Sequence, residues 1–199
     1  MKRIYLSAIF SAALIFTGCK NENTTPEERV DENTDLTQEN VEEVEEEVLE
    51  LKVQMEPKSG SDLTGTVTFT QENEEVTMTA EFTGLKEGMH AIHLHEKADC
   101  SAEDGTSAGG HWNPTFEDHG EWGSQKGYHR GDIGNFDVNA EGKGSITFTT
   151  DQWCIGCDDD KKNIIGKAVI VHDGVDDFTS QPSGAAGTRI GCGVIKDVE

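Results

Sequence analysis

From about residue 51 onward, the sequence is a succession of short stretches in which apolar and polar side chains alternate. These stretches are LELKVQM, TGTVTFT, EVTMTAEF, HAIHLH, SITFTT and KAVIVH. Alternation with a period of two is the pattern of a β-strand that buries one face. Segments rich in Gly, Asp and Ser separate the stretches, and none of them has a sustained helical period. The sequence therefore predicts an all-β domain, either a sandwich or a barrel.

Two long segments of this domain, residues 96–130 and 173–188, lack the strand pattern. Most connections between elements of a compact domain are far shorter, and loops of this length are usually functional. We therefore expect the functional residues of the domain to lie largely in these two segments.

The N-terminus has the features of an export signal. The positively charged MKR precedes an apolar run, Ile4 to Phe16, that is too short to span a bilayer. The following FTGC resembles a bacterial lipobox, in which cleavage after Gly18 leaves a lipid on Cys19 and anchors the chain to a membrane. Phe16 stands where Leu is more usual, so a plain secretory signal with an incidental cysteine is the alternative. Both interpretations predict export, and the first predicts the bacterial cell envelope, on its periplasmic side or at the cell surface.

The segment after the signal is polar and strongly acidic. Residues 1–50 contain 13 acidic and 4 basic residues, which accounts for −9 of the net charge of −23. Such a segment cannot bury enough apolar surface to offset the entropy of ordering. We predict a signal peptide at residues 1–18, a disordered tether at 19–50 and a folded domain at 51–199. The domain keeps a charge near −14, which argues against nucleic acid as a partner.

Three of the seven histidines lie in one predicted strand. Side chains alternate between the two faces of a strand, so His93 and His95 share one face, while His90 shares the other with Ile92 and Leu94. The two aliphatic residues mark their face as the one toward the core. The strand therefore offers two histidines outward and one inward, and an isolated pair of this kind is as often solvated as metal-bound.

A second group of histidines follows in a glycine-rich segment. His111, His119, His129 and Asp132 have the spacing H-x7-H-x9-H-x2-D, and His172 ends a later predicted strand. Three imidazoles and a carboxylate suit a tetrahedral zinc site, and imidazole-rich sites suit copper as well as zinc. The glycines allow a loop to curl so that distant ligands converge. The pattern predicts a metal centre.

Residues 51–199 resemble the copper/zinc superoxide dismutase family. The matching segments are GLKEGMHAIHLHE, GTSAGGHWNP, DHG, HRGDIGN, GKAVIVHDGVDD and GTRIGCGVI. The resemblance implies a Greek-key β-barrel or sandwich of about eight antiparallel strands with long metal-binding and electrostatic loops. It also implies copper and zinc as cofactors and superoxide as the small-molecule substrate, which is converted to dioxygen and hydrogen peroxide.

The same resemblance implies a role for each histidine and for three other residues. It makes His93, His95, His111 and His172 the copper ligands. It makes His111, His119, His129 and Asp132 the zinc ligands, with His111 bridging the two ions. Asp176 is implied to hydrogen-bond a ligand of each metal, His90 to be structural, and Arg189 to stand at the mouth of the site.

The implied mechanism alternates copper between Cu(II) and Cu(I). His111 is implied to leave the copper on reduction, to take up a proton and to pass it to the product, while zinc holds and tunes His111. Arg189 docks the anionic substrate. A domain near −14 repels superoxide, and the segment 173–188 contains three aspartates and no lysine. We therefore expect weak electrostatic steering that rests mainly on Arg189.

The cysteines of the domain form two pairs in the sequence. The resemblance implies a disulfide between Cys100 and Cys192, and export to an oxidising compartment permits it. Cys100 lies eleven positions before His111, and the extra residues SAEDG lengthen this part of the loop. Cys154 and Cys157, in WCIGC, lie outside the family pattern. They are open to three interpretations: a local disulfide, a redox pair, or an additional thiolate metal site.

Two other functions compete with a dismutase. One is a non-catalytic envelope protein that binds copper or zinc on the same scaffold, and such a protein would need neither Arg189 nor a full set of four histidines for copper. The other is a tethered adhesion module, which would leave the histidines unexplained. The sequence leaves a monomer and a homodimer equally open.

Overall fold

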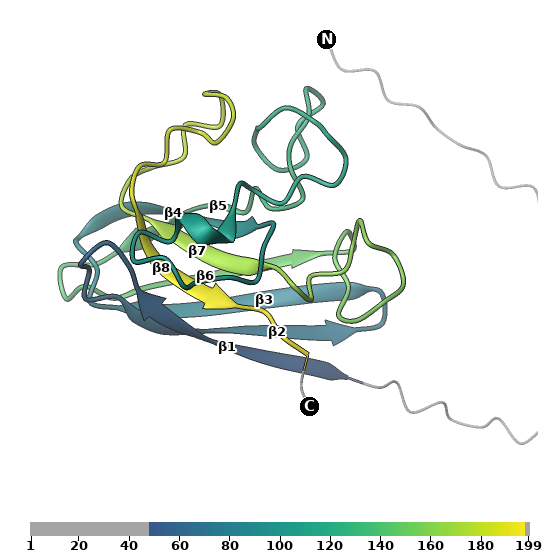
Figure 1. The fold of residues 1–199 in the computed structure, drawn as a ribbon, viewed down its shortest axis with the longest axis horizontal. Coiled ribbons are helices and arrows are strands. Elements are labelled where there is room, and N and C mark those ends of the chain that lie inside the picture. Colours follow the sequence, from purple (N-terminus) through teal and green to yellow (C-terminus); the bar gives the residue numbers. More distant parts are fainter. Residues whose placement is uncertain (1–47, 198–199) are drawn as a thin grey trace, which may run out of the picture. The chain divides into compact units, whose positions relative to one another are not determined.

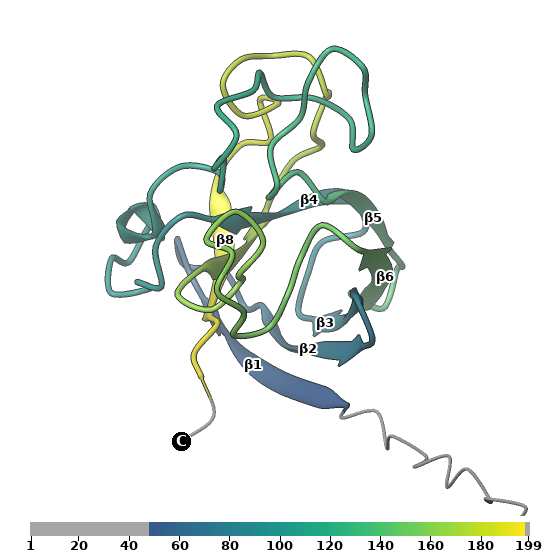
Figure 2. The ribbon, with the colours of Figure 1, turned by 90° about the vertical axis from the view of Figure 1, so that its right-hand side faces the viewer.

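The structure, a computed structural model, describes residues 48–197 and contains eight antiparallel strands that close into a barrel (Figures 1 and 2). The strands are β1 (Leu49–Pro57), β2 (Thr64–Glu72), β3 (Glu75–Thr83), β4 (Gly88–His95), β5 (Gly134–Val138), β6 (Gly144–Thr150), β7 (Ala168–His172) and β8 (Arg189–Val194). Their order around the barrel is β1-β2-β3-β6-β5-β4-β7-β8. The prediction of an all-β domain with about eight antiparallel strands is confirmed.

In the first strands, the apolar residues of the alternating sequence pattern are buried and the polar residues between them are exposed or partly exposed. In β1, Leu51, Val53 and Met55 are buried while the residues between them are exposed. Val53 lies opposite Val67 of β2, and both belong to the core inside the barrel. Complete burial of an aliphatic side chain of this size contributes about 1.5–3 kcal/mol. The apolar face of each strand therefore determines the register of the barrel.

The strand β4 departs from simple alternation because both of its faces are buried. Ile92 and Leu94 lie inside the barrel, as predicted, and His90 packs beside Phe136 with ring centroids 6.0 Å apart. His93 on the opposite face is fully buried, because the segments 96–130 and 173–188 both lie over β4 and β7 (Figures 1 and 2). From Ala91 to His95 the outward side of this strand therefore faces the two long loops, while Met89 at its start stays exposed.

Two of the eight strands, β5 and β8, are not among the alternating stretches identified in the sequence; β5 is short but does alternate in burial. In β8, Gly191 and Gly193 take the positions at which apolar side chains would reveal the strand. A Cβ at Gly191 would lie 2.7 Å from a methyl group of Leu63, and one at Gly193 would lie 2.6 Å from Val53. Core side chains fill the space beside these glycines. The alternation of apolar and polar residues that would mark β8 in the sequence is therefore missing.

At the N-terminal end of the described residues, β1 begins at Leu49, two residues before the predicted domain boundary at residue 51. The predicted signal peptide, the lipidation site at Cys19 and nearly all of the predicted tether lie outside residues 48–197. Within residues 48–197 there is no helix with the length and hydropathy needed to cross a membrane.

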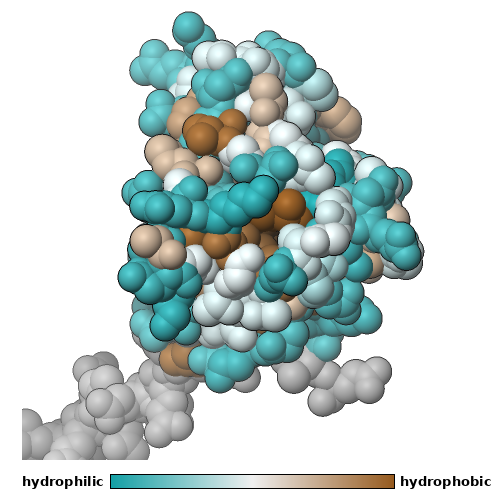
Figure 3. Space-filling model, turned by 90° about the vertical axis from the view of Figure 1, so that its left-hand side faces the viewer, coloured by the Kyte–Doolittle hydropathy of each residue, from teal (hydrophilic) through white to brown (hydrophobic). Residues whose placement is uncertain are grey.

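One end of the barrel carries a hollow with hydrophobic residues at its base (Figure 3). An open pocket of about 520 Å³ lies where the β1–β2 and β3–β4 connections meet, and it is lined in part by Leu85, Ile190 and His90. Both ring nitrogens of His90 lie within hydrogen-bonding distance of carbonyl oxygens, those of His172 (2.8 Å) and Lys86 (2.9 Å). His90 therefore has no free nitrogen to offer a metal.

Candidate metal centre

The structure brings the predicted ligands together in two sets that share one histidine. In each set, one potential ligand atom of every residue lies within 4.8 Å of those of the others, and all of these residues are buried. The four-histidine set consists of His93, His95, His111 and His172. The mixed set consists of His111, His119, His129 and Asp132.

The four-histidine set is supported by the barrel. His93 and His95 lie on β4 and His172 ends β7, which pairs directly with β4. His111 comes from the segment 96–130 but forms an isolated antiparallel bridge with His95. Backbone hydrogen bonds of the sheet therefore place three of these rings, and a single bridge adds the fourth.

The mixed set is organised around the carboxylate of Asp132. The backbone N–H of His129 donates to Asp132 Oδ2 (2.8 Å) and that of Gly120 donates to the same oxygen (3.2 Å). Asp132 Oδ1 accepts from Nδ1 of His111 (2.8 Å) and Nδ1 of His129 (3.1 Å). His119 Nδ1 lies 3.0 Å from Oδ2 but has no hydrogen-bonding geometry there. The carboxylate thus gathers three rings around one point.

The hydrogen bonds of the histidines show which nitrogen remains available. His93 Nε2 donates to Asp176 Oδ2 (2.8 Å) and His95 Nδ1 donates to the carbonyl of Gly109 (2.9 Å). A carboxylate or carbonyl only accepts, so the proton is on the bonded nitrogen and the other nitrogen has a free lone pair. The nitrogens on the other side of the rings are buried and lack a hydrogen-bond partner; they are His93 Nδ1, His95 Nε2, His111 Nε2, His119 Nδ1 and His172 Nε2. On His119 this nitrogen carries a proton in the metal-free chain, because the pKa of the ring is raised to about 9. Buried imidazole nitrogens without partners fit metal ligands.

Asp176 connects the two sets. Its Oδ2 accepts from His93, and its Oδ1 accepts from Nε2 of His119 (2.9 Å). Asn135 at the end of β5 holds the backbone of Asp176 by two hydrogen bonds, one in each direction (2.8 and 2.9 Å). One buried carboxylate therefore orients a ring of each set.

Residue 184 must be glycine for this bridge to form. Gly184 has φ of +65° and passes directly over the Asp176–His119 hydrogen bond. A Cβ at this position would overlap Asp176 Oδ1 and would lie 2.6 Å from His119 Nε2. The segment 173–188 thus approaches the site by its backbone.

The two sets differ in their electrostatics. Burial lowers the pKa of His111 to about 4 and that of His172 to about 3, so both rings are neutral at neutral pH. Burial acts in the same direction on His119, but the carboxylates of Asp132 and Asp176 outweigh it and raise its pKa to about 9. The four-histidine set is a group of neutral lone pairs, whereas the mixed set combines negative carboxylates with a ring that retains its proton.

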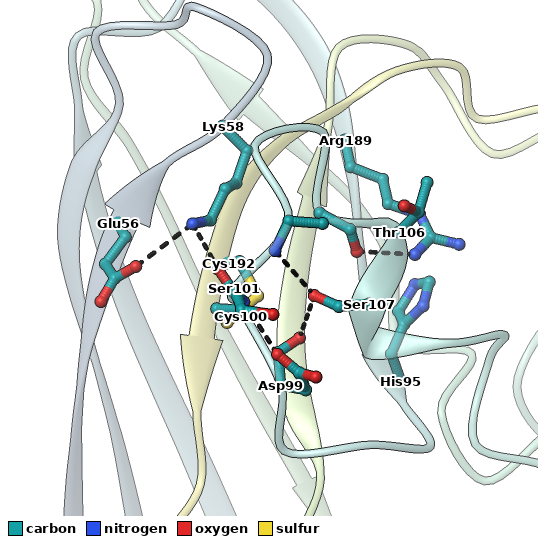
Figure 4. The surroundings of a disulfide bond; sticks show 12 residues. Glu56, Lys58, His95, Asp99, Cys100, Ser101, Thr106, Ser107, Arg189 and Cys192 are labelled. Carbon is teal, nitrogen blue, oxygen red and sulfur yellow. Dashed lines mark hydrogen bonds and ion pairs between the residues drawn. A yellow bond between two sulfur atoms is a disulfide. The ribbon is translucent and has the colours of Figure 1, made fainter.

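Arg189, at the start of β8, is half-buried beside the four-histidine set. Its guanidinium donates to the carbonyl of Gly105 (2.8 Å), and its charge contributes to the lowered pKa values of His95 and His172. Lys58 lies on the other side of the Cys100–Cys192 disulfide and donates to the carbonyl of Cys100 (2.6 Å; Figure 4). The lengthened loop that follows Cys100 is therefore held by one cation on each side.

The aspartates of the segment 173–188 are used in local hydrogen bonds. Asp173 Oδ1 accepts the backbone N–H of Thr188 (2.6 Å). The hydroxyl and N–H of Ser180 and the N–H of Thr179 lower the pKa of Asp177 to about 2. The carboxylate of Asp177 therefore stays ionised at neutral pH and keeps a negative charge on this loop.

The structure pairs Cys154 with Cys157 as well as Cys100 with Cys192. Of the three interpretations of WCIGC, it is the local disulfide that the structure contains. Sequence reasoning gave no role to several residues that contact the site. Asn135 stands within the quoted segment HRGDIGN, where its position in the motif was a signal, whereas Gln181 holds the backbone of His119 by two hydrogen bonds of 2.9 Å without any signal in the sequence.

Comparisons with known proteins agree with this geometry. A family model described as copper/zinc superoxide dismutase (SODC) matches residues 63–195. The chain is 39% identical over 139 residues to the extracellular superoxide dismutase (Cu-Zn) of Drosophila melanogaster. The alignment covers 66% of this chain and 74% of that relative.

Two solved structures are similar in fold. A double mutant of a SOD-like protein from Bacillus subtilis has a TM-score of 0.66 and 31% identity, with 73% of this chain and 97% of that chain covered. The clock protein EA4 has a TM-score of 0.65 and 31% identity, with 75% of this chain and 94% of that chain covered.

Proposed function

The chain belongs to the copper/zinc superoxide dismutase family, an oxidoreductase family with copper and zinc as cofactors, and we propose that its four-histidine set holds copper and its mixed set holds zinc. The observation that carries this proposal is the shared residue His111, whose Nδ1 lies against Asp132 of the mixed set and whose Nε2 is buried without a partner. Bound copper supplies the one-electron redox chemistry by which two superoxide anions become dioxygen and hydrogen peroxide. The carboxylate in the mixed set suits zinc, and the all-imidazole set suits copper.

The proposed role of His111 is to hold and transfer a proton at Nε2. Asp132 fixes the ring through Nδ1, so Nε2 keeps one orientation toward the four-histidine set. A proton gained at Nε2 during turnover would therefore lie on the side of the four-histidine set, where it can be given to the peroxide product. A positioned acid of this kind contributes about 10²–10⁴-fold in rate.

Arg189 is proposed to dock superoxide beside the four-histidine set. Its guanidinium is always charged, is planar and is fixed at one nitrogen by Gly105, which leaves its other nitrogens for a small anion. Half-burial strengthens its attraction for an anion relative to a fully solvated arginine. Neutral molecules such as water gain nothing from this charge, so the residue selects for the substrate.

The proposed role of the mixed set is structural and electrostatic. With zinc bound, the rings of His111 and His119 and the carboxylate of Asp132 are held at one point, and the orientation of His111 follows from it. We further propose that the protein acts in antioxidant defence in the cell envelope, anchored by a lipid on Cys19. Two disulfides in the described residues and an extracellular relative support an oxidising, exported location.

The test is to load the purified full chain with copper and zinc and to measure superoxide consumption together with metal content. We expect catalysis in the loaded chain, and a loss of about 10²-fold or more in the His111→Ala variant. Lys126→Ala, which changes an exposed lysine of the same loop, is the matched control and should retain the rate. Stoichiometric metal binding without superoxide consumption would instead support the non-catalytic envelope binding protein.

A further inference from the structure

The connection between β6 and β7, residues 151–167, contains the disulfide that the family pattern does not include. We call it the β6–β7 segment. Cys154 and Cys157 close a four-residue loop within it. The backbone of Cys154 is bonded in both directions, donating to the carbonyl of Lys162 (2.9 Å) and accepting from the N–H of Ile164 (3.0 Å). The disulfide thus lies at the base of a closed loop, whose two ends meet in a parallel bridge between Cys154 and Asn163.

Asn163 secures this turn from inside. Its Oδ1 accepts the backbone N–H of Gly156 (3.1 Å) and of Ile165 (3.0 Å), and its Nδ2 donates to the carbonyl of Cys157 (3.0 Å). A single amide side chain therefore satisfies three backbone groups. A segment with this many internal bonds is a rigid support and not a loose loop.

The rigid segment reaches the mixed set at its N-terminal end. Trp153, which is buried, donates its indole N–H to the carbonyl of Arg130 (2.8 Å). Gln152 exchanges a hydrogen bond with the hydroxyl of Tyr128 at 2.8–2.9 Å. Tyr128 and Arg130 are the two neighbours of His129 in the sequence. The β6–β7 segment therefore grips the chain immediately before and immediately after one ligand of the mixed set.

Aromatic packing supports both hydrogen bonds. The ring of Trp153 packs on Phe148 with centroids 5.1 Å apart and edge-on to Phe69 at 6.1 Å. Trp122 stands between the two contacts, 4.9 Å from the ring of Tyr128 and 5.9 Å from that of Trp153. Aromatic pairs in these arrangements stabilise the packing beyond the effect of burial alone. This aromatic cluster thereby fixes residues 128–130, which include the proposed zinc ligand His129, to the barrel.

We propose that Gln152 and Trp153, held by the Cys154–Cys157 disulfide, are positioning residues for His129, and that the β6–β7 segment thereby sets the affinity of the mixed set for zinc. The inference rests on the proposed function, which assigns zinc to this set. Its physical basis is that groups orienting a metal ligand from outside are worth about 10–100-fold in metal affinity. Because these contacts touch neither His93 nor His95 nor His172, the affinity for copper does not depend on them.

The experiment measures zinc and copper affinity separately in the purified full chain, by competition with chromophoric chelators. Trp153→Phe keeps an aromatic ring and removes the indole N–H, and Tyr128→Phe removes only the hydroxyl. We expect each to weaken zinc binding by about 10-fold and to leave copper binding within about 2-fold. The double variant Cys154→Ser/Cys157→Ser should weaken zinc binding in the same direction.

Cobalt provides a second readout that is independent of activity. Co²⁺ placed in the mixed set absorbs visible light according to the positions of its ligands, so a displaced His129 changes the spectrum. We expect altered Co²⁺ spectra for Trp153→Phe and Tyr128→Phe. Phe69→Leu is the matched control, because Phe69 packs on Trp153 but its side chain forms no hydrogen bond with residues 128–130. It should lower stability without changing zinc affinity or the spectrum.

Two results would overturn the inference. One is unchanged zinc affinity and unchanged Co²⁺ spectra in both phenylalanine variants. The other is an equal loss of zinc affinity in Phe69→Leu, which would assign the effect to general destabilisation. If the unaltered chain takes up no zinc at the mixed set, the proposed function fails as well, so the unaltered chain separates the two failures.

Discussion

The two halves of the metal centre are built by different means. The four-histidine set lies on β4 and at the end of β7, so paired strands place most of its rings. The mixed set lies almost wholly in loops and is placed by side-chain hydrogen bonds to Asp132 and Asp176. A ladder of backbone bonds is insensitive to single substitutions, whereas a carboxylate that organises a loop is a single point of failure. We therefore expect single substitutions to weaken zinc binding at the mixed set more than copper binding at the four-histidine set.

The most severe way to test this difference is to remove the organising carboxylate. We expect Asp132→Ala to weaken zinc binding by more than about 100-fold, since it removes a ligand as well as the acceptor of four hydrogen bonds. Copper binding should fall by much less, because only His111 of the four-histidine set contacts Asp132. Metal affinities measured by chelator competition check this. Equal losses for both metals would show that the halves are not independent in their construction.

A smaller effect should follow from a side chain at residue 184. In Gly184→Ala the Cβ overlaps Asp176 Oδ1, so the hydrogen bond to His119 is lost and the positive φ becomes strained. We expect zinc affinity to fall by about 10-fold or more and stability to fall by about 1–3 kcal/mol. Chelator competition and denaturant unfolding measure the two quantities. Gly60→Ala is the control, since Gly60 also has positive φ but has open space around its Cβ position and lies outside the loops of the metal centre; it should lower stability alone.

One part of the four-histidine half does depend on a loop, and it sharpens the comparison. Arg189 is fixed by the carbonyl of Gly105 in the lengthened loop after Cys100. We expect Arg189→Ala to lower the catalytic rate constant by about 10-fold or more and to reduce its dependence on salt, with metal content unchanged. Superoxide consumption measured across ionic strengths checks this. An unchanged rate constant with unchanged salt dependence would remove Arg189 from the proposed mechanism.

The smallest expected difference concerns protons. Metal-free His119 has its pKa raised to about 9, so below that pH it carries a proton that zinc must displace. His111 and His172 have pKa values lowered to about 4 and 3, so copper displaces none of theirs at neutral pH. We expect about one proton to be released per zinc at pH 7.5, and zinc affinity to fall as the pH falls below 9. Calorimetry in buffers of different ionisation enthalpy measures the number, and proton release on copper binding alone would contradict it.

The sequence predicts much of this molecule for identifiable reasons. The sequence pattern found six strands, of which β4 and β7 are buried on both faces over most of their length. It failed for β8 because Gly191 and Gly193 leave no side chain at positions that face the core. The ligands converge in the structure as the resemblance implied, since their spacing follows the loops that bring them together. The strand parity also placed His93 and His95 on the face away from the core, although it did not foresee that the loops bury them.

The supporting contacts could not be predicted in the same way. Gln181 lies 62 residues from His119, and Gln152 lies 24 residues from Tyr128. No periodicity connects such positions, because their contact depends on how separate loops pack on the barrel. Trp153 illustrates the point: in the sequence it is a core aromatic beside a cysteine, and only the fold shows its N–H directed at the loop that carries His129.

The carboxylate of Asp176 has a consequence for how the centre is filled. Its two oxygens hold one ring of each set. A metal that fixes His93 therefore also restrains Asp176, which orients His119, and a metal that fixes His119 restrains His93 in the same way. By thermodynamic linkage, the factor by which zinc tightens copper binding must equal the factor by which copper tightens zinc binding. Couplings of this kind typically amount to about 5–150-fold. The order in which the metals arrive then changes the intermediate through which the protein passes, while the completed centre is the same by either route.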